Sequence, residues 1–254
     1  MNEVVVETSG KVVSVVLDRP PVNALTMALY RRLAEVFDEI GKRTDVNCAV
    51  LTARGSRAFC AGLDLREFLA AKVEDDPERA VTVRRMFAAV RHCAIPVIAA
   101  VNGPALGAGA VLAAVCDIRI ASANATFGLP EINVGRCGGG AHLGRLVPQG
   151  LLRRMFFTGA PISAAEAYRI GLVEEVVAPE RLRAAALELA AVIAEKAPLG
   201  LRLGKQALNE IELLPVEEGY AREQSYSTQL LHTADAREAT RAVLEKRPPV
   251  FHGT

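Results

Sequence analysis

Residues 96–109 read PVIAAVNGPALGAG and lie inside an uncharged run that extends from Cys93 to Cys116. A run of that length is long enough to cross a bilayer as a helix. Proline and glycine interrupt it, however, at Pro96, Gly103, Pro104, Gly107 and Gly109. These residues disfavour one continuous helix. The stretch therefore predicts a buried strand over 97–101, a glycine-rich loop and then a short buried helix.

The residues before this stretch predict further strands and helices. Two β-branched runs, at 4–6 and 12–17, are typical of short strands, and the apolar residues 48–51 predict another. Thr26 is placed to cap a helix whose apolar side chains recur on one face, at Leu29, Leu33, Val36, Phe37 and Ile40. Residues 65–92 are charged and helical in character, which fits a solvated pair of surface helices or a mobile cover over a site.

The residues after it continue the alternation. We expect strands over 117–121 and 172–177, and a helix opened by a capping box in which Ser163 and Glu166 each satisfy the other's backbone N–H. From Pro179 onward the pattern is helical. Residues 198–254 have too few apolar positions to build a core alone, so we expect this appendage to pack on another surface. Strands and helices therefore alternate up to Pro179.

Composition excludes several classes of protein. The 254 residues carry 30 basic and 29 acidic side chains without a block of like charge. This balance suggests neither a nucleic-acid partner nor a membrane partner, although a local basic site for a small anion stays open. The five cysteines are widely spaced, which disfavours a disulfide framework or a metal site and is typical of reduced thiols in a cytoplasmic protein. No secretory signal is visible at the N-terminus.

Two small-residue loops are the remaining candidates for chemistry. The sequence lacks the motifs of phosphate-binding loops, dinucleotide-binding folds, α/β-hydrolases and zinc proteases. The loops at 58–65 and 102–109 each follow a short strand and lead into apolar helical sequence. If they face each other, their free N–H groups can stabilise a developing oxyanion. On spacing alone, tight strand-to-helix turns are the favoured explanation of both loops.

Seven segments in order along the chain carry a resemblance. They are Leu17-Asp18-Arg19-Pro20 with Asn23-Ala24-Leu25, AFCAGLDL (58–65), PVIAAVNGPALGAG (96–109), CDIRIA (116–121), FGLPEINVG (127–135), TGAPISAAEAYRIGLVEEVV (158–177) and Glu245-Lys246-Arg247. The chain resembles the enoyl-CoA hydratase/isomerase family, the crotonase superfamily. The resemblance implies the α/β class, with a crotonase-like spiral of ββα repeats over 1–197 that holds the acyl-CoA site. It also implies a helical trimerisation region over 198–254, in a homotrimer or a dimer of trimers.

The resemblance also assigns catalytic positions. The family's two oxyanion-hole N–H groups fall on Leu63 and Ala108, where Ala108 replaces the usual glycine and keeps the N–H. Of the two glutamates that hydratases of the family use, one is Glu131 and the other position is Val111. Asp64 is expected to be structural, as a loop or N-cap acceptor. Coenzyme A enters as part of the thioester substrate, so no separate cofactor and no metal are expected.

Binding positions follow in the same way. The family's CoA and pantetheine path falls on Ala24, Ala58, Ala61 and Gly62, its pocket backbone on Gly139, and its nucleotide-contacting lysine on Lys246. The acyl pocket is expected to be lined by Phe68, Leu69, Met86, Phe87 and Val111. His142 departs from the family pattern and has no assigned role.

A single glutamate favours double-bond isomerisation, because one carboxylate can remove a proton at one carbon and return it at another. Two alternatives stay open. One is an enoyl-CoA hydratase or hydratase-lyase that uses the same glutamate alone. The other, from a different class, is a non-catalytic acyl-CoA binding subunit, against which Glu131 beside an intact oxyanion hole argues.

Overall fold

The computed structural model describes residues 3–254 and contains two sheets. The larger sheet has the strand order β1-β2-β3-β4-β6-β9, and within it β1 pairs antiparallel with β2 while the other neighbours are parallel. Its strands are β1 (Val4–Ser9), β2 (Val12–Leu17), β3 (Cys48–Ala53), β4 (Val97–Val101), β6 (Ile118–Ser122) and β9 (Glu175–Val177). The smaller sheet pairs β5 (Ala105–Leu106), β7 (Thr126–Gly128) and β8 (Ile162–Ser163).

Helices and single turns connect the strands, and their alternation confirms the α/β class. The connecting elements are α1 (Met27–Lys42), α2 (Leu65–Ala70), η1 (Val73–Asp75), α3 (Asp76–Arg91), α4 (Ala108–Ala114), η2 (Pro130–Val134), α5 (Gly140–Leu143), α6 (Gln149–Thr158), α7 (Ala164–Arg169), η3 (Pro179–Arg181) and α8 (Leu182–Ala194). The Thr26 hydroxyl accepts a hydrogen bond from the Leu29 N–H at 3.2 Å, so the predicted cap of α1 is confirmed. The predicted helical stretch over 65–92 is divided into α2, η1 and α3.

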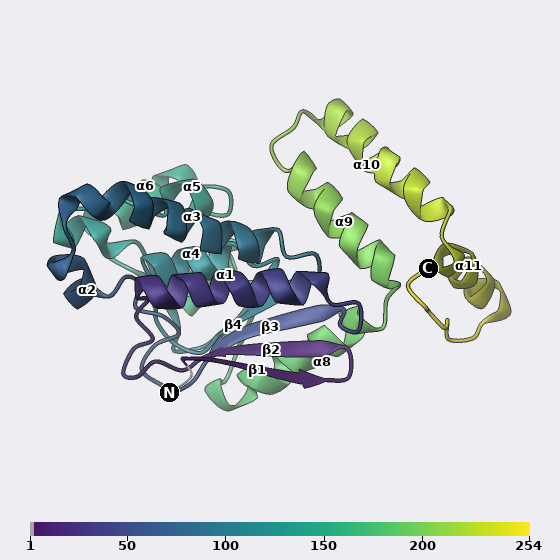
Figure 1. Cartoon of the computed structure of the whole chain (residues 1–254), viewed down its shortest axis with the longest axis horizontal. Helices are drawn as coiled ribbons and strands as arrows, with labels where there is room; N and C mark the ends of the chain where they lie inside the picture. Colours follow the sequence, from purple (N-terminus) through teal and green to yellow (C-terminus); the bar gives the residue numbers. More distant parts are fainter. Residues whose placement is uncertain (1–2) are drawn as a thin grey trace.

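The central strands of the larger sheet are buried on both faces. Successive side chains of a strand point to opposite faces, and each face has its own apolar cluster. On β4, Val97 and Ala99 belong to the cluster that contains α1 and α3, whereas Ile98 and Ala100 belong to the cluster that contains α8. Figure 1 shows α1 and α8 on opposite sides of the strands. This double cover explains why β4 is an unbroken apolar run rather than an alternating one.

The uncharged run of residues 93–116 is divided as its proline and glycine residues predict. It forms β4, β5 and α4, which lie in the core. No helix within residues 3–254 has both the length and the apolar character needed to cross a bilayer.

Two local expectations differ from the structure. The strand expected over 172–177 is limited to β9, because Leu172 and Val173 turn back and donate their N–H groups to the Ala167 carbonyl. The capping box at Ser163 is only half formed. Ser163 accepts from the Glu166 N–H at 3.2 Å, but the Glu166 carboxylate binds Arg169 at 2.7 Å instead of returning to Ser163.

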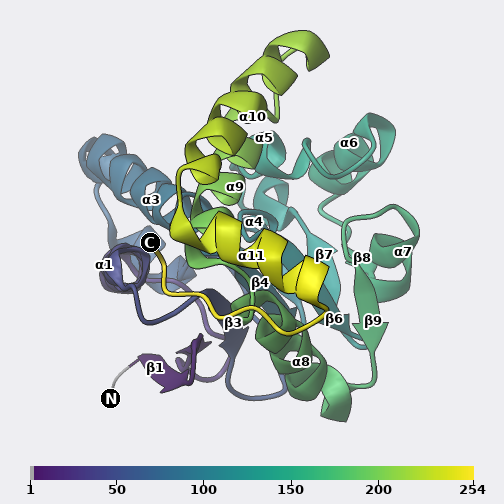
Figure 2. The same cartoon turned by 90° about the vertical axis from the view of Figure 1, so that its right-hand side faces the viewer.

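The C-terminal region contains three helices and no strand, namely α9 (Pro198–Ile211), α10 (Val216–Leu231) and α11 (Ala234–Glu245), but the expectation that it is helical throughout was wrong, because residues 247–254 after α11 are irregular. Figures 1 and 2 show α9 and α10 as a hairpin on one side of the molecule, with α11 beyond them. Lys205 of α9 anchors the region to the core, because its buried ammonium group binds Asp117 at 2.7 Å and the Ile95 carbonyl at 3.0 Å. Several large apolar side chains of the region face solvent in the single chain: Leu208, Leu213, Val216, Tyr220, Leu231, Val243 and Leu244.

Candidate active site

A cavity of about 600 Å³ lies where the two glycine-rich loops meet helices α1 and α3 and the segment that follows β7. Seven of the residues expected in the site line it: Ala61, Gly62, Leu63, Ala108, Val111, Glu131 and Gly139. The structure therefore brings both loops and the glutamate to one volume. A cavity of this size is in the usual range for small-molecule sites.

Backbone pairing holds the two loops together. Leu106 donates its N–H to the Cys60 carbonyl at 2.9 Å, and a β-bridge joins Cys60 to Ala105. Gly109 is required at this junction, because a Cβ there would lie 2.1 Å from the Cys60 carbonyl oxygen. Gly62 has φ +91°, and a Cβ on it would lie 2.8 Å from the Leu106 carbonyl oxygen. Larger residues at either glycine would separate the loops.

The Leu63 and Ala108 N–H groups form no hydrogen bond with any of residues 3–254. Around Leu63 the neighbouring groups are paired, since Leu25 donates to the Gly62 carbonyl at 2.7 Å and Asp64 donates to the Leu25 carbonyl at 3.0 Å. Ala108 is the first residue of α4, where a helical N–H has no partner within its own helix. Two unpaired N–H groups thus line the cavity from opposite loops, which is the arrangement that can stabilise an oxyanion.

Glu131 lies on η2 with its carboxylate against the second loop. A Cβ on Gly107 would lie 2.9 Å from Glu131 Oε1, and a Cβ on Gly138 would lie 3.7 Å from it. Glu131 Oε2 is buried and finds no hydrogen-bond partner in the described part of the chain. Burial raises the pKa of the Glu131 carboxyl, because the charged form loses solvation. An unpaired carboxylate with a raised pKa is suited to accept a proton from a bound molecule.

Val111 makes the facing wall apolar. Its side chain packs close to Gly139, where a Cβ would lie 2.9 Å from Val111 Cγ2. Asp76 is the other carboxylate among the lining residues, and it accepts a hydrogen bond from Arg136 at 3.2 Å. Glu131 is therefore the one lining carboxylate, within residues 3–254, that has no cationic partner.

The structural role expected of Asp64 is confirmed. Asp64 caps α2 by accepting from the Arg66 and Glu67 N–H groups, each at 3.0 Å, and it pairs with Arg19 at 2.7 Å. The hydrogen bond from Glu67 is the largest of the effects that lower the pKa of Asp64. Asp64 thus holds the end of the first loop in place and has no part in the chemistry.

Three expected positions lie outside the cavity lining. Ala24 and Ala58 serve the loop framework, because their carbonyls accept hydrogen bonds from Arg19 and Asn23, each at 3.0 Å. Lys246 ends α11 in a left-handed conformation, with φ +54°. Figure 1 shows α11 at the opposite end of the molecule from α2, so Lys246 is not brought to the cavity of its own chain.

The expectation for the acyl wall was partly wrong. Phe68 and Phe87 line the cavity, but Met86 is fully buried in the core and Leu69 is 86% exposed and outside the lining. Both follow from helix geometry, since neighbouring residues of a helix point about 100° apart. His142 lies beside Phe87, with ring centroids 5.6 Å apart, and it does not line the cavity.

Several polar residues of the cavity were missed by the sequence interpretation, and Tyr30 and Arg79 are two of them. Tyr30 of α1 and Arg79 of α3 both line it. Burial is the main cause that raises the pKa of the Tyr30 phenol, and the charge of Glu131 adds to it. The signal for Arg79 was present, because the residues of α3 that line the cavity follow helical spacing: Asp76, Arg79, Ala80, Val83, Arg84 and Phe87.

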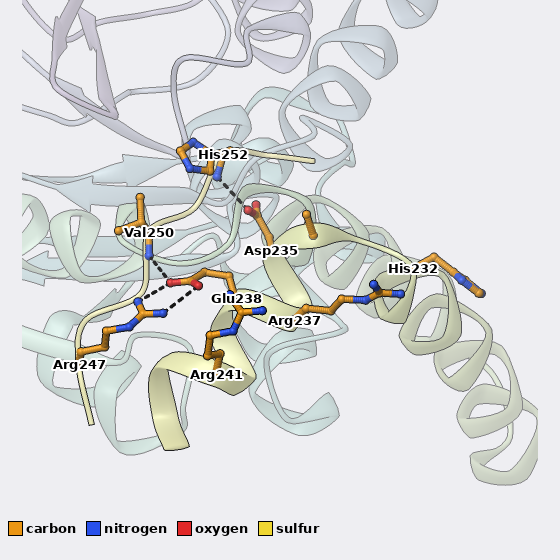
Figure 3. Close-up of a pocket in the computed structure, with 9 residues that line it drawn as sticks. His232, Asp235, Arg237, Glu238, Arg241, Arg247, Val250 and His252 are labelled. Carbon is orange, nitrogen blue, oxygen red and sulfur yellow. Dashed lines mark hydrogen bonds and ion pairs between the residues drawn. The ribbon is translucent and has the colours of Figure 1, made fainter. Parts of the chain in front are cut away.

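A second cavity, of about 630 Å³, lies in the C-terminal region (Figure 3). Its carboxylates are already bound within the chain. Glu238 accepts from Arg247 at 2.6 and 3.0 Å and from the Val250 N–H at 3.0 Å, while Asp235 accepts from the His252 N–H at 2.8 Å. These contacts hold the chain end beside α11 and leave neither acid free as a base. No group of three potential metal-ligating acids, histidines or cysteines occurs within residues 3–254.

Comparison with known proteins agrees with this geometry. The family model described as enoyl-CoA hydratase/isomerase matches residues 7–254. The short-chain-enoyl-CoA hydratase of Clostridium acetobutylicum is 38% identical over 251 residues, which is 97% of this chain and 96% of that protein. The 2,3-dehydroadipyl-CoA hydratase of Escherichia coli is 37% identical over 261 residues, covering 100% of both. The crystal structure of an enoyl-CoA hydratase from Bacillus anthracis superposes with a TM-score of 0.96, at 34% identity and full coverage of both chains.

The fold and the site together define an acyl-thioester enzyme with a crotonase-like spiral, which confirms the expected fold. The chain belongs to the enoyl-CoA hydratase/isomerase family.

Proposed function

We propose that the enzyme moves a proton within enoyl-CoA thioesters and so shifts their double bond, with Glu131 as the only base. The thioester oxygen accepts hydrogen bonds from the Leu63 and Ala108 N–H groups, which stabilise the enolate. Glu131 removes a proton from the α-carbon and returns it to the γ-carbon. The double bond thereby moves from the β,γ position to the α,β position. No cofactor other than the CoA of the substrate itself takes part.

One observation carries this proposal, namely that the Glu131 carboxylate has no cationic partner within residues 3–254 and faces an apolar wall. Its Oε2 is buried without a partner in the described chain, and Val111 supplies no second acid or base. Proton transfer between two carbons of one substrate needs a single carboxylate. Addition of water is easier with two groups, one to activate the water and one to protonate the carbon.

Hydration by the same single glutamate is the second candidate. It is favoured by the names of similar proteins, because the Clostridium acetobutylicum and Escherichia coli relatives are both named hydratases. In this reaction Glu131 takes a proton from water while the oxygen adds to the β-carbon, and it then gives the proton to the α-carbon. The oxyanion hole has the same role in both reactions.

The experiment that separates them uses a panel of enoyl-CoA thioesters in deuterated water, followed by mass spectrometry. Isomerisation moves the double bond without adding water, whereas hydration adds the mass of one water molecule. The matched control is Glu131→Gln, which keeps the shape of the side chain and removes proton transfer. If the parent binds the thioesters but neither isomerises, hydrates nor exchanges deuterium, it is a binding subunit and the proposal is wrong.

We also propose that residues 198–254 form the assembly region of a homotrimer or a dimer of trimers, beside a core over 1–197. Its exposed apolar side chains, such as Leu244 at 79% exposure, support this proposal. Because Lys246 lies away from the cavity of its own chain, its contact with CoA would be made to a neighbouring subunit's ligand. Cytoplasmic location stays a prediction.

Leu244→Asp tests the assembly. The substitution places a charge on a surface that is exposed in the single chain, so the fold should persist while burial between subunits becomes unfavourable. We expect sedimentation velocity to show a shift toward monomer, with the far-ultraviolet circular dichroism unchanged. Glu223→Asp, at an exposed acidic position of α10, is the control. A Leu244→Asp protein that sediments like the parent would contradict this assignment of the interface.

A further inference from the structure

We propose that Arg79 is a specificity-determining residue that binds a second carboxylate at the far end of the acyl chain. The preferred substrates would then be CoA thioesters of dicarboxylic acyl groups. The inference rests on the proposed function in one respect, that an acyl thioester occupies the cavity. It adds the chemical class of the acyl group, which the thioester chemistry leaves open.

Within residues 3–254 the Arg79 guanidinium has one ion-pair partner, Glu67, and that contact is long. Its Nη2 is buried without a hydrogen bond to any of residues 3–254. The nearest carboxylate oxygen is Glu67 Oε2 at 3.8 Å, which is beyond hydrogen-bonding distance. That same oxygen accepts the Met27 N–H at 2.9 Å and is therefore already engaged. A buried N–H group without a hydrogen bond is unfavourable, so Nη2 of Arg79 is suited to a ligand that supplies the missing acceptor.

Arg79 and the catalytic glutamate face the same volume. Both line the cavity together with Tyr30. Burial is the main cause that raises the pKa of the Tyr30 phenol, the negative charge of Glu131 raises it further, and the positive charge of Arg79 lowers it. All three side chains therefore border the volume that an acyl group would occupy. An acyl chain whose thioester lies at Glu131 can extend past Tyr30 toward Arg79.

The other two arginines of the lining are differently placed. Arg136 binds Asp76 at 3.2 Å and stacks over Phe68 at 4.6 Å from the ring centroid. Arg84 is exposed to solvent. Arg79 has only 16% of its side chain exposed, and it also borders an adjoining hollow of about 850 Å³ that gives longer acyl chains room.

A carboxylate is the group that fits a buried guanidinium best. The planar guanidinium presents parallel N–H groups that match the two oxygens of a carboxylate. An acyl chain that ends in a methyl group would cover Arg79 and leave these donors unpaired. The site therefore discriminates in both directions. A terminal carboxylate adds an ion pair with Arg79, whereas a terminal methyl group covers a guanidinium N–H that has no acceptor.

The test is a binding comparison of saturated thioesters, which need no turnover. Adipyl-CoA and hexanoyl-CoA have equal chain length and differ in the terminal group, as do glutaryl-CoA and pentanoyl-CoA. We expect the parent to bind the carboxylate of each pair about 10–100-fold more tightly, as expected for a charged hydrogen-bonded pair. Arg79→Met should remove this preference, and Arg79→Lys should retain part of it. Arg85→Met is the matched control, since Arg85 lies on the same helix and pairs with Asp38 at the exposed surface.

The outcomes distinguish this inference from the proposed function. If the parent binds both members of each pair equally, the inference is wrong and the acyl-CoA site stands. If Arg79→Met weakens all thioesters and free CoA alike, Arg79 contacts the CoA moiety and the inference is also wrong. A preference equally strong for 5-oxohexanoyl-CoA would show a site for a neutral carbonyl and would overturn the carboxylate assignment. If no thioester binds at all, both proposals fail together.

Discussion

Two carboxylates of this protein have opposite surroundings, Glu131 in the cavity between the loops and Glu238 in the cavity of the C-terminal region. Glu238 accepts three hydrogen bonds, two from Arg247 and one from the Val250 N–H. These hydrogen bonds lower the pKa of Glu238 to about 2. Glu131 Oε2 has no partner among residues 3–254, and burial raises the pKa of its carboxyl.

The difference separates a structural acid from a reactive one. The satisfied carboxylate of Glu238 fastens the chain end to α11, as Figure 3 shows. Its low pKa makes it a weak base, because the charged form is already stabilised. The unsatisfied carboxylate of Glu131 gains stabilisation when it takes a proton. A cavity is therefore a candidate active site when one of its acids has no hydrogen-bond partner. The number of acids in the cavity does not decide this.

Glu131→Gln is the substitution with the largest expected effect. The amide keeps the shape of the side chain but cannot accept the proton, so kcat should fall about 10²–10⁴-fold while the affinity for CoA thioesters changes little. The matched variant Glu238→Gln should keep kcat within about threefold, because that acid touches no substrate. Steady-state kinetics on the enoyl-CoA thioester found active above would measure both. An equal fall of kcat in the two variants would contradict the assignment of Glu131 as the base and Glu238 as a structural acid.

Ala108→Pro tests the oxyanion hole with the next largest effect. Proline suits the first position of a helix, so α4 should form, but the N–H donor is lost. Removing one such donor costs about 3–4 kcal/mol of transition-state stabilisation, or roughly 10²–10³-fold in kcat. Ala108→Gly keeps the donor and is the control, with activity expected near that of the parent. A folded and fully active Ala108→Pro protein would exclude this N–H from catalysis.

Val111→Glu should produce a smaller change, in the direction of hydration. The new carboxylate would face the cavity that holds Glu131, and two close acids resist simultaneous ionisation, so one tends to keep a proton. Such a pair can hold a water molecule with one acid as base and the other as proton donor. We expect hydration of crotonyl-CoA to rise about tenfold or more, measured by loss of the enoyl-thioester absorbance. If the parent already hydrates it at about 10²–10³ per second, the second carboxylate is dispensable and isomerisation is not favoured.

The sequence predicted most of the fold because the deciding signals are local. The breaks at Pro96, Gly103 and Gly107 separate β4 from α4, and Thr26 caps α1 as its spacing indicates. The half-formed box at Ser163 was not predictable, because Arg169 competes for Glu166 from one helical turn further on. Short strands such as β5 and β7 also escaped prediction, since their pairing depends on partners distant in sequence.

The site was predictable where motifs fix the backbone and not where side chains from other elements enter it. Leu63, Ala108 and Glu131 come from glycine-containing loops whose order along the chain carries the resemblance. Tyr30 and Arg79 come from helices whose orientation depends on the packing of α1 against α3. Lys246 is a motif position for which the prediction did not hold within one chain. It ends α11, which lies at the opposite end of the molecule from α2.

The smallest expected effect is on stability against pH, where the two carboxylates should act in opposite directions. The raised pKa of Glu131 means that the folded protein binds more protons there than the unfolded chain. Its contribution to the free energy of unfolding therefore falls as pH rises from about 4.5 through the raised pKa. The pKa of Glu238, lowered to about 2 mainly by Arg247, gives stability that is present above about 4.5 and is lost as pH falls toward 2.

Chemical denaturation between about pH 3.5 and pH 8 would measure both effects against the two glutamine variants. Relative to the parent, Glu131→Gln should gain stability as pH rises, because the variant no longer buries a charge. Glu238→Gln should lose stability relative to the parent over the same rise, because only the ionised acid binds Arg247 fully. The kcat/KM of the parent should fall as pH drops through the raised pKa of Glu131, since the base must be ionised. Parallel pH profiles for the two variants would show that their surroundings do not differ in the way that the structure indicates.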